Sequence, residues 1–209
     1  FGPEKFDDPN YNLPLYDPLW SAISDAGIAA TFHVGTGRDP RVARKNGGAV
    51  INLTWGARAT AISTLAHVCA SGLLDRHPRL RFAIIEAGVG WVPWTLESMD
   101  EAYRKHHMWV QPKLKRGLPS EYFRAHGFAS FEEDVVGIAL VESMRLENSF
   151  LWANDYPHAE GTWPHSAAAI ERQMGGLREG TRRNLLGENA CRLLGLDPAE
   201  LIARRRTAS

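Results

Sequence analysis

The chain has 209 residues, of which 44% are hydrophobic and 23% charged, and 24 Lys and Arg residues balance 24 Asp and Glu residues. This composition is typical of a soluble globular protein with one sizeable core. Zero net charge gives no reason to expect nucleic acid or an anionic membrane surface as a partner. No apolar run approaches the roughly 18 residues of a membrane span, so we also expect no membrane partner.

The two cysteines, Cys69 and Cys191, fall in helix-like patterns and lack the CxxC spacing of a metal or redox motif. We therefore interpret them as reduced thiols in a reducing compartment, which predicts a cytoplasmic protein. The chain begins with Phe1 rather than Met, and we expect it to be a piece of a longer protein.

The order of the expected elements is an initial loop, a helix, and then strands that alternate with helices. Residues 1–16 are rich in Pro, Asn, Asp and aromatic residues without a period, which indicates a loop. Turn residues and hydrophobic periods then predict a helix over 17–27, a strand over 28–34, a loop over 38–56, a helix over 57–71, a strand over 81–86, a helix over 93–106, a loop over 108–126 with a turn at 119–122, a strand over 127–131, a helix over 135–144, a strand over 150–153, a helix over 165–174, a helical pair around 185–194 and a tail over 197–209.

Alternation of strands and helices predicts an α/β fold with a parallel sheet and right-handed crossovers. Three of the four strands carry a polar side chain at the carboxyl end, namely His33, Glu86 and Asp155. In parallel α/β folds this edge of the sheet is where catalytic side chains gather. A carboxylate such as Glu86 at the end of a buried strand also needs a partner or a function.

The stretch FLWANDYPHAEG, residues 150–161, carries the strongest of these signals. Its apolar run is followed at once by Asp155, and Pro157 prevents the strand from continuing. His158 comes three residues after the acid. The alternative interpretation is that Asp155 caps a turn and His158 is an ordinary loop residue.

Five blocks of the sequence resemble, in family order, the C-terminal part of the amidohydrolase-related proteins, in the branch that includes aminocarboxymuconate-semialdehyde decarboxylase and aromatic-acid decarboxylases. The blocks are PLWSAISDAGIAATFHVG, HPRLRFAIIEAGVGWVPWTLESMDE, PSEYFRAHGFASFEED, FLWANDYPHAEG and ENACRLLGL. The resemblance implies a (β/α)8 TIM barrel with a divalent metal at its C-terminal mouth. The four strands would be the last four of eight, in a single domain with an initial loop (1–16), a barrel half (17–196) and a tail (197–209).

By this resemblance, His33 is a metal ligand, and Asp155 binds the metal and handles a proton. Glu86 stands where many members of the family have a histidine. The role of that histidine is therefore not carried over, and a catalytic role for Glu86 is a hypothesis about this sequence alone. His158 and Trp91 are expected to line the mouth and contact the substrate, or else to pack structurally. Imidazole and carboxylate ligands suit Zn²⁺, our first expectation, or Mn²⁺.

The predicted function is that of a metal-dependent enzyme that hydrolyses or non-oxidatively decarboxylates a small carboxylated or cyclic substrate, as a homo-oligomer when full length. The family's His-x-His pair on the first strand is absent from this sequence. The alternative is therefore a catalytically incomplete half-barrel with a ligand-binding or structural role. The apolar strands at 28–34 and 150–153 would be edges, which invite association with other chains.

Overall fold

The computed structural model describes residues 10–34, 45–106, 108–111 and 113–207, and its centre is a four-stranded parallel sheet. The strand order follows the sequence, and each strand pairs with the next in register, for example His33 opposite Ile85 and Phe131 opposite Trp152. This confirms the predicted parallel α/β arrangement. The strands are Ala29–His33 (β1), Arg81–Ile85 (β2), Gly127–Phe131 (β3) and Phe150–Trp152 (β4).

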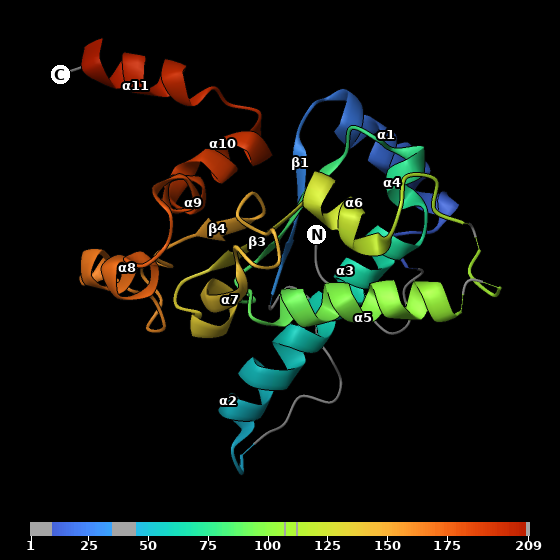
Figure 1. Ribbon diagram of the computed structural model, residues 1–209, viewed down its shortest axis with the longest axis horizontal. Helices are drawn as coiled ribbons and strands as arrows, with labels where there is room; N and C mark the ends of the chain where they lie inside the picture. The colour runs from blue at the N-terminus through green and yellow to red at the C-terminus, as the bar shows by residue number, and fades with distance from the viewer. Residues whose placement is uncertain (1–9, 35–44, 107, 112, 208–209) are drawn as a thin grey trace.

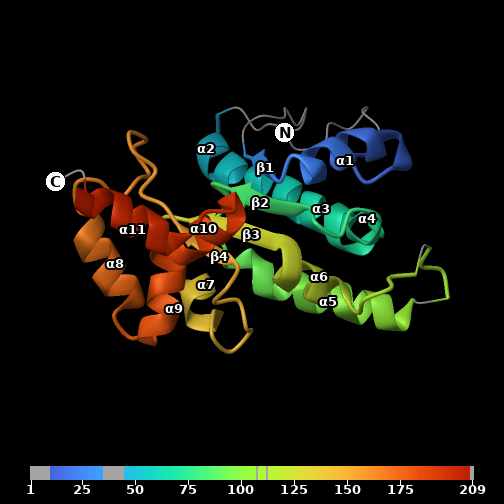
Figure 2. The same cartoon turned by 90° about the horizontal axis from the view of Figure 1, so that it is seen from above.

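Helices precede the first strand, connect each strand to the next and follow the last strand. Figures 1 and 2 show α1 at the β1 end and α8, α9 and α10 grouped at the β4 end. In the described part of the chain no helix combines the length and apolar character that crossing a membrane requires. The α-helices are Asp17–Asp25 (α1), Gly48–Ile51 (α2), Ala57–Ala70 (α3), Leu73–Arg76 (α4), Trp91–Lys105 (α5), Pro119–His126 (α6), Val135–Leu140 (α7), Ser166–Met174 (α8), Glu179–Arg183 (α9), Asn189–Leu194 (α10) and Pro198–Thr207 (α11), with a 3-10 turn at Pro14–Tyr16 (η1) and π-helical turns at Asn52–Gly56 (η2) and Asn184–Glu188 (η3).

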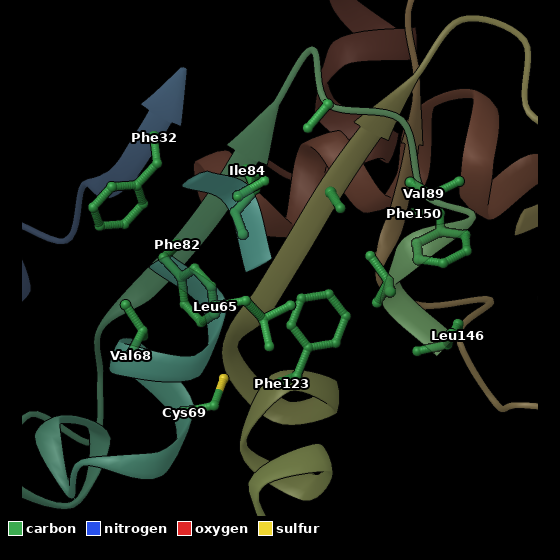
Figure 3. Close-up of a cluster of buried hydrophobic side chains, with 14 of the residues drawn as sticks. Phe32, Leu65, Val68, Cys69, Phe82, Ile84, Val89, Phe123, Leu146 and Phe150 are labelled. Carbon is green, nitrogen blue, oxygen red and sulfur yellow. The ribbon is translucent and has the colours of Figure 1, made fainter. Parts of the chain in front are cut away.

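The main hydrophobic core lies between one face of the sheet and the helices α3, α5 and α6 (Figure 3). Phe82 on β2 packs edge-to-face against Phe123 on α6, with ring centroids 6.1 Å apart. Leu65 of α3 is fully buried in the same cluster. Burying each such side chain contributes about 1.5–3 kcal/mol, so this face holds the helices to the sheet.

A smaller hydrophobic cluster lies on the other face of the sheet. It joins Ala83, Phe128 and Leu151 to Leu193 of α10. Arg81, the first residue of β2, donates from Nε to the carbonyl oxygen of Leu193 at 2.9 Å. Helix α10 therefore lies against the amino end of β2, opposite the end where the candidate site residues lie.

Several boundaries differ from the sequence prediction. The sequence predicts a loop over 38–56, but α2, η2 and α3 follow one another without interruption, so residues 48–56 are helical. Residues 38–44 of that expected loop lie outside the described residues. Residues 119–126 form α6 instead of a turn, because Pro119 occupies the first turn and the Glu121 side chain accepts from the Leu118 N–H at 2.7 Å. Helix α7 ends at Leu140.

The expected C-terminal tail contains helix α11. Asp197 accepts from the Ala199 N–H at 2.8 Å, and Pro198 stands at the first helical position, so a start signal is present in the sequence. The strands β1 and β4 each pair with a single neighbour among the described strands. At the β4 edge, Asn189 of α10 donates to the Phe150 carbonyl oxygen at 2.7 Å, which satisfies one acceptor of that edge.

Candidate functional site

Glu86 directly follows β2 and turns its side chain back toward β1. Its backbone lies in the left-handed region, with φ of 63°, and its N–H donates to Ser130 Oγ of β3 at 2.8 Å. The Oε2 atom of Glu86 is 3.0 Å from Nε2 of His33, and the Glu86 side chain is 18% exposed. A non-glycine residue in this conformation costs free energy and is common where function requires it.

His33 has partners on both ring nitrogens. Nδ1 is 2.7 Å from the Val34 carbonyl oxygen, which can only accept, so Nδ1 carries a hydrogen. Nε2 is left to face the carboxylate of Glu86. An imidazole that donates one N–H to a backbone carbonyl and directs its other nitrogen at a polar site has the orientation found in metal-ligating histidines.

Asp155 follows β4 and also has a left-handed backbone, with φ of 54°. Its Oδ2 atom is buried and has no hydrogen-bond partner among the residues that the structure describes. A buried carboxylate oxygen without a donor is costly, and a cation is one way to compensate it. A metal ion bound to Asp155 Oδ2 would therefore take the place of the hydrogen bonds that this atom lacks.

The loop after Asp155 folds back and brings His158 beside the acid. The His158 N–H donates to the Asp155 carbonyl oxygen, and the Thr162 N–H donates to that of Asn154, both at 2.9 Å. Gly161 allows this turn, because a Cβ there would lie 2.5 Å from the Asn154 oxygen. The side chain of His158 remains exposed.

These segments meet at the carboxyl end of the sheet. Glu86, Asp155 and His158 each offer one ligand atom, and the three atoms lie within 4.8 Å of one another. His33 reaches the same group through Glu86. Imidazole nitrogen and carboxylate oxygen suit Zn²⁺ and Mn²⁺, so the donor set and the uncompensated Asp155 oxygen fit a divalent metal. The roles of the individual residues stay predictions.

Glu132 is an acidic residue of this region that the sequence analysis did not single out. It directly follows β3 and is partly buried. Burial raises the pKa of Glu132, the negative charges of Asp155 and Glu86 raise it further, and Arg58 partly opposes them. An acid immediately after an apolar strand, as at Glu86 and Asp155, was the signal that could have found it.

Asp134 joins the loop after β2 to the loop after β3. Its Oδ2 accepts from the backbone N–H groups of Val89 and Gly90, both at 2.7 Å, and its Oδ1 accepts from the Gly137 N–H at 2.8 Å as the cap of α7. A Cβ at position 90 would lie 2.7 Å from Oδ1, so glycine is required for this contact. The short loop that follows Glu86 is thereby fixed.

Trp91, the other expected substrate contact, begins α5. Its indole N–H donates to the carbonyl oxygens of Ala87 and Gly88, at 3.1 and 2.9 Å, and its ring packs against the main core. The structure thus gives Trp91 a packing role within its own loop. Contact between Trp91 and a substrate stays a prediction.

The chain belongs to the amidohydrolase family, because the sequence profile of that family matches residues 1–196 of its 209. The fold is accordingly part of a (β/α)8 barrel, as the resemblance implied. A comparison with curated protein sequences finds no match.

Solved structures support this fold assignment. The chain is similar to 5-carboxyvanillate decarboxylase from Sphingomonas paucimobilis, with 24% identity, a TM-score of 0.73, and coverage of 93% of this chain and 57% of that one. It is similar to a dihydroxybenzoic acid decarboxylase from Polaromonas sp. JS666 with bound manganese and the inhibitor 2-nitroresorcinol, with 19% identity, a TM-score of 0.63, and coverage of 90% and 56%. For 4-oxalomesaconate hydratase from Rhodopseudomonas palustris the identity is 16%, the TM-score 0.68, and the coverage 100% and 58%. The chain thus spans less than two thirds of these proteins.

Proposed function

We propose that this chain is the C-terminal part of a metal-dependent amidohydrolase-related enzyme that removes carbon dioxide, without oxidation, from a small carboxylated ring compound. The observation that carries the proposal is the meeting of His33, Glu86 and Asp155, which follow or end three different strands, at one end of the sheet. Decarboxylases among the similar structures support this choice of reaction.

In the proposed reaction, a divalent metal held by His33 and Asp155 would orient the substrate and stabilise the negative charge that develops on it. Breaking the bond to the carboxyl group leaves an electron pair on a ring carbon, which must accept a proton. Asp155 is our candidate for moving that proton, since its Oδ2 has no hydrogen-bond partner within the described residues. Nε2 of His33 would bind the metal in place of its 3.0 Å contact with Glu86 Oε2. Glu86 is a second proposed catalytic residue, and His158 and Trp91 are the proposed substrate contacts.

A second candidate reaction is the addition of water, by hydrolysis or hydration. The similarity to a hydratase over the whole of this chain favours it. Here a bound metal would lower the pKa of water toward roughly 7, and Asp155 would accept the proton of that water. The alternative to an enzyme is a non-catalytic half-barrel that binds a ligand or has a purely structural role.

The test uses the longer protein that contains this chain, supplied with Mn²⁺ or Zn²⁺. Carbon dioxide release would be measured from small aromatic carboxylates such as 5-carboxyvanillate and 2,6-dihydroxybenzoate, and water addition would be followed by ultraviolet absorbance. Asp155→Asn is expected to abolish turnover with the fold retained, whereas Glu160→Gln, at an exposed position of the same loop, is expected to keep it. Near-normal turnover by Asp155→Asn would contradict the role of Asp155, and no turnover by the unmodified protein would favour the non-catalytic alternative.

A further inference from the structure

Arg58 lies near the start of α3, beside the candidate site. The connection between the parallel strands β1 and β2 returns the chain from the carboxyl end of one strand to the amino end of the next, so α3 begins at the carboxyl ends. The residues that line a small cavity at this end include His33 of β1 and Thr60 of α3. The Nη2 atom of Arg58 lies 3.6 Å from the point where a Cβ at Gly88 would stand. The guanidinium group therefore lies against the loop that follows Glu86.

The charge of Arg58 acts on an acid of the site, although Arg58 is not paired with any acid there. It partly opposes burial and the negative charges of Asp155 and Glu86, which raise the pKa of Glu132. Among the described residues, the guanidinium donates to one acceptor, the Leu53 carbonyl oxygen, and forms no ion pair with a carboxylate. A guanidinium has five N–H donors, so this half-buried group keeps donors for an anion.

We propose that Arg58 binds a second carboxylate of the substrate, one that takes no part in the reaction, so that the substrate is a ring carrying two carboxylates. The inference rests on the proposed function for the ring, its reacting carboxyl group and the bound metal. Arginine suits this task because its planar fork donates two parallel hydrogen bonds to a carboxylate. Its positive charge also offsets the acids of the site, which repel a doubly negative substrate.

The reacting carboxyl group is a poor partner for Arg58. It leaves as carbon dioxide, which is uncharged, so a strong ion pair with it would stabilise the bound substrate more than the transition state and would slow the reaction. A second carboxylate keeps its charge throughout, and its contact with Arg58 stabilises the bound substrate and the transition state equally. We therefore expect Arg58 to determine which carboxylated rings bind.

The experiment measures binding to the longer protein that contains this chain, loaded with Mn²⁺, by isothermal titration calorimetry. The probes are benzene-1,3-dicarboxylate, benzene-1,4-dicarboxylate and benzoate. The unmodified protein should bind the better of the two dicarboxylates at least about tenfold more tightly than benzoate, because only a dicarboxylate reaches Arg58 with a second charge. Arg58→Ala should weaken the binding of that dicarboxylate by about ten- to a hundredfold and change the affinity for benzoate by less than about threefold.

Three further variants separate the charge of Arg58 from its other contacts. Arg58→Gln can still donate to the Leu53 carbonyl oxygen but has no charge, so it should behave like Arg58→Ala. Arg58→Lys keeps the charge and loses the planar fork, so its affinity for the dicarboxylate should be intermediate. Arg79→Ala is the matched control and should change neither affinity, because Arg79 is exposed in the turn before β2, at the opposite end of that strand, and pairs with Asp25. Circular dichroism checks the fold of each variant.

The proposal is overturned if the unmodified protein binds neither dicarboxylate more tightly than benzoate. It is also overturned if Arg58→Ala weakens the binding of benzoate and of the dicarboxylate by the same factor, which is the result expected of a purely structural residue. Because these affinities are measured without turnover, they are independent of the carbon dioxide release that tests the proposed function. A protein that releases carbon dioxide but prefers benzoate would keep the proposed function and refute this inference.

Discussion

The left-handed backbone of Glu86 predicts that this position favours glycine over alanine. Glu86→Ala and Glu86→Gly both remove the carboxylate and its 3.0 Å contact with His33, so their difference isolates the backbone. With φ of 63°, alanine must keep a conformation that costs a non-glycine residue about 1–2 kcal/mol. Glycine adopts it without that cost.

The opposing effect is the greater freedom of glycine in the unfolded chain, which costs about 0.4–1 kcal/mol relative to alanine. The balance leaves Glu86→Gly more stable than Glu86→Ala by about 0.5–1 kcal/mol. For a chain of this size the difference corresponds to about 1–4 °C in Tm. Urea unfolding followed by circular dichroism gives the two free energies of unfolding directly.

Glu101 provides the matched control, because it is an exposed glutamate in the interior of α5, paired with Lys105. There the order should reverse, with glycine less stable than alanine by about 0.8–1 kcal/mol. If alanine is also the more stable residue at position 86, the strain argument is wrong, and the conformation of Glu86 carries no measurable cost.

Two other predictions concern residues that hold the site and the fold. Asp134→Ala should lower the free energy of unfolding by about 2 kcal/mol, because three backbone N–H groups lose their acceptor. The control Glu133→Ala, which removes an exposed ion pair, should lower it by less than about 1 kcal/mol. Equal losses for the two variants in urea unfolding would refute this prediction. Burial alone raises the pKa of Asp75, but hydrogen bonds from the Tyr122 hydroxyl and the Lys115 N–H, with help from Arg116, hold it below its usual 3.8. The ionised Asp75 therefore stabilises the fold above that usual pKa and loses this contribution as the pH falls through the lower pKa of the folded state. Asp75→Asn should accordingly lower the free energy of unfolding at pH 7 and lower it progressively less below pH 3.8. If the loss of stability in Asp75→Asn did not change with pH, the lowered pKa of Asp75 would be contradicted.

The sequence by itself determined the strands and the polar residues at their ends. Apolar runs such as the one before Asp155 are buried on both faces of a parallel sheet, so their pattern predicts strands reliably, and Pro157 fixes where the last one ends. Parallel strands place their carboxyl ends at the same end of the sheet. That rule predicts from the sequence alone that His33, Glu86 and Asp155 lie near one another.

Only the tertiary structure decided which atoms meet there. The position of His158 depends on a loop that closes through backbone hydrogen bonds, and the left-handed conformation of Glu86 is accompanied by a hydrogen bond to Ser130 of the neighbouring strand. Asp134 reaches across 44 or 45 residues of sequence to the N–H groups of Gly90 and Val89. Such long-range contacts leave no periodic signal in the chain, because they arise from the packing of whole elements.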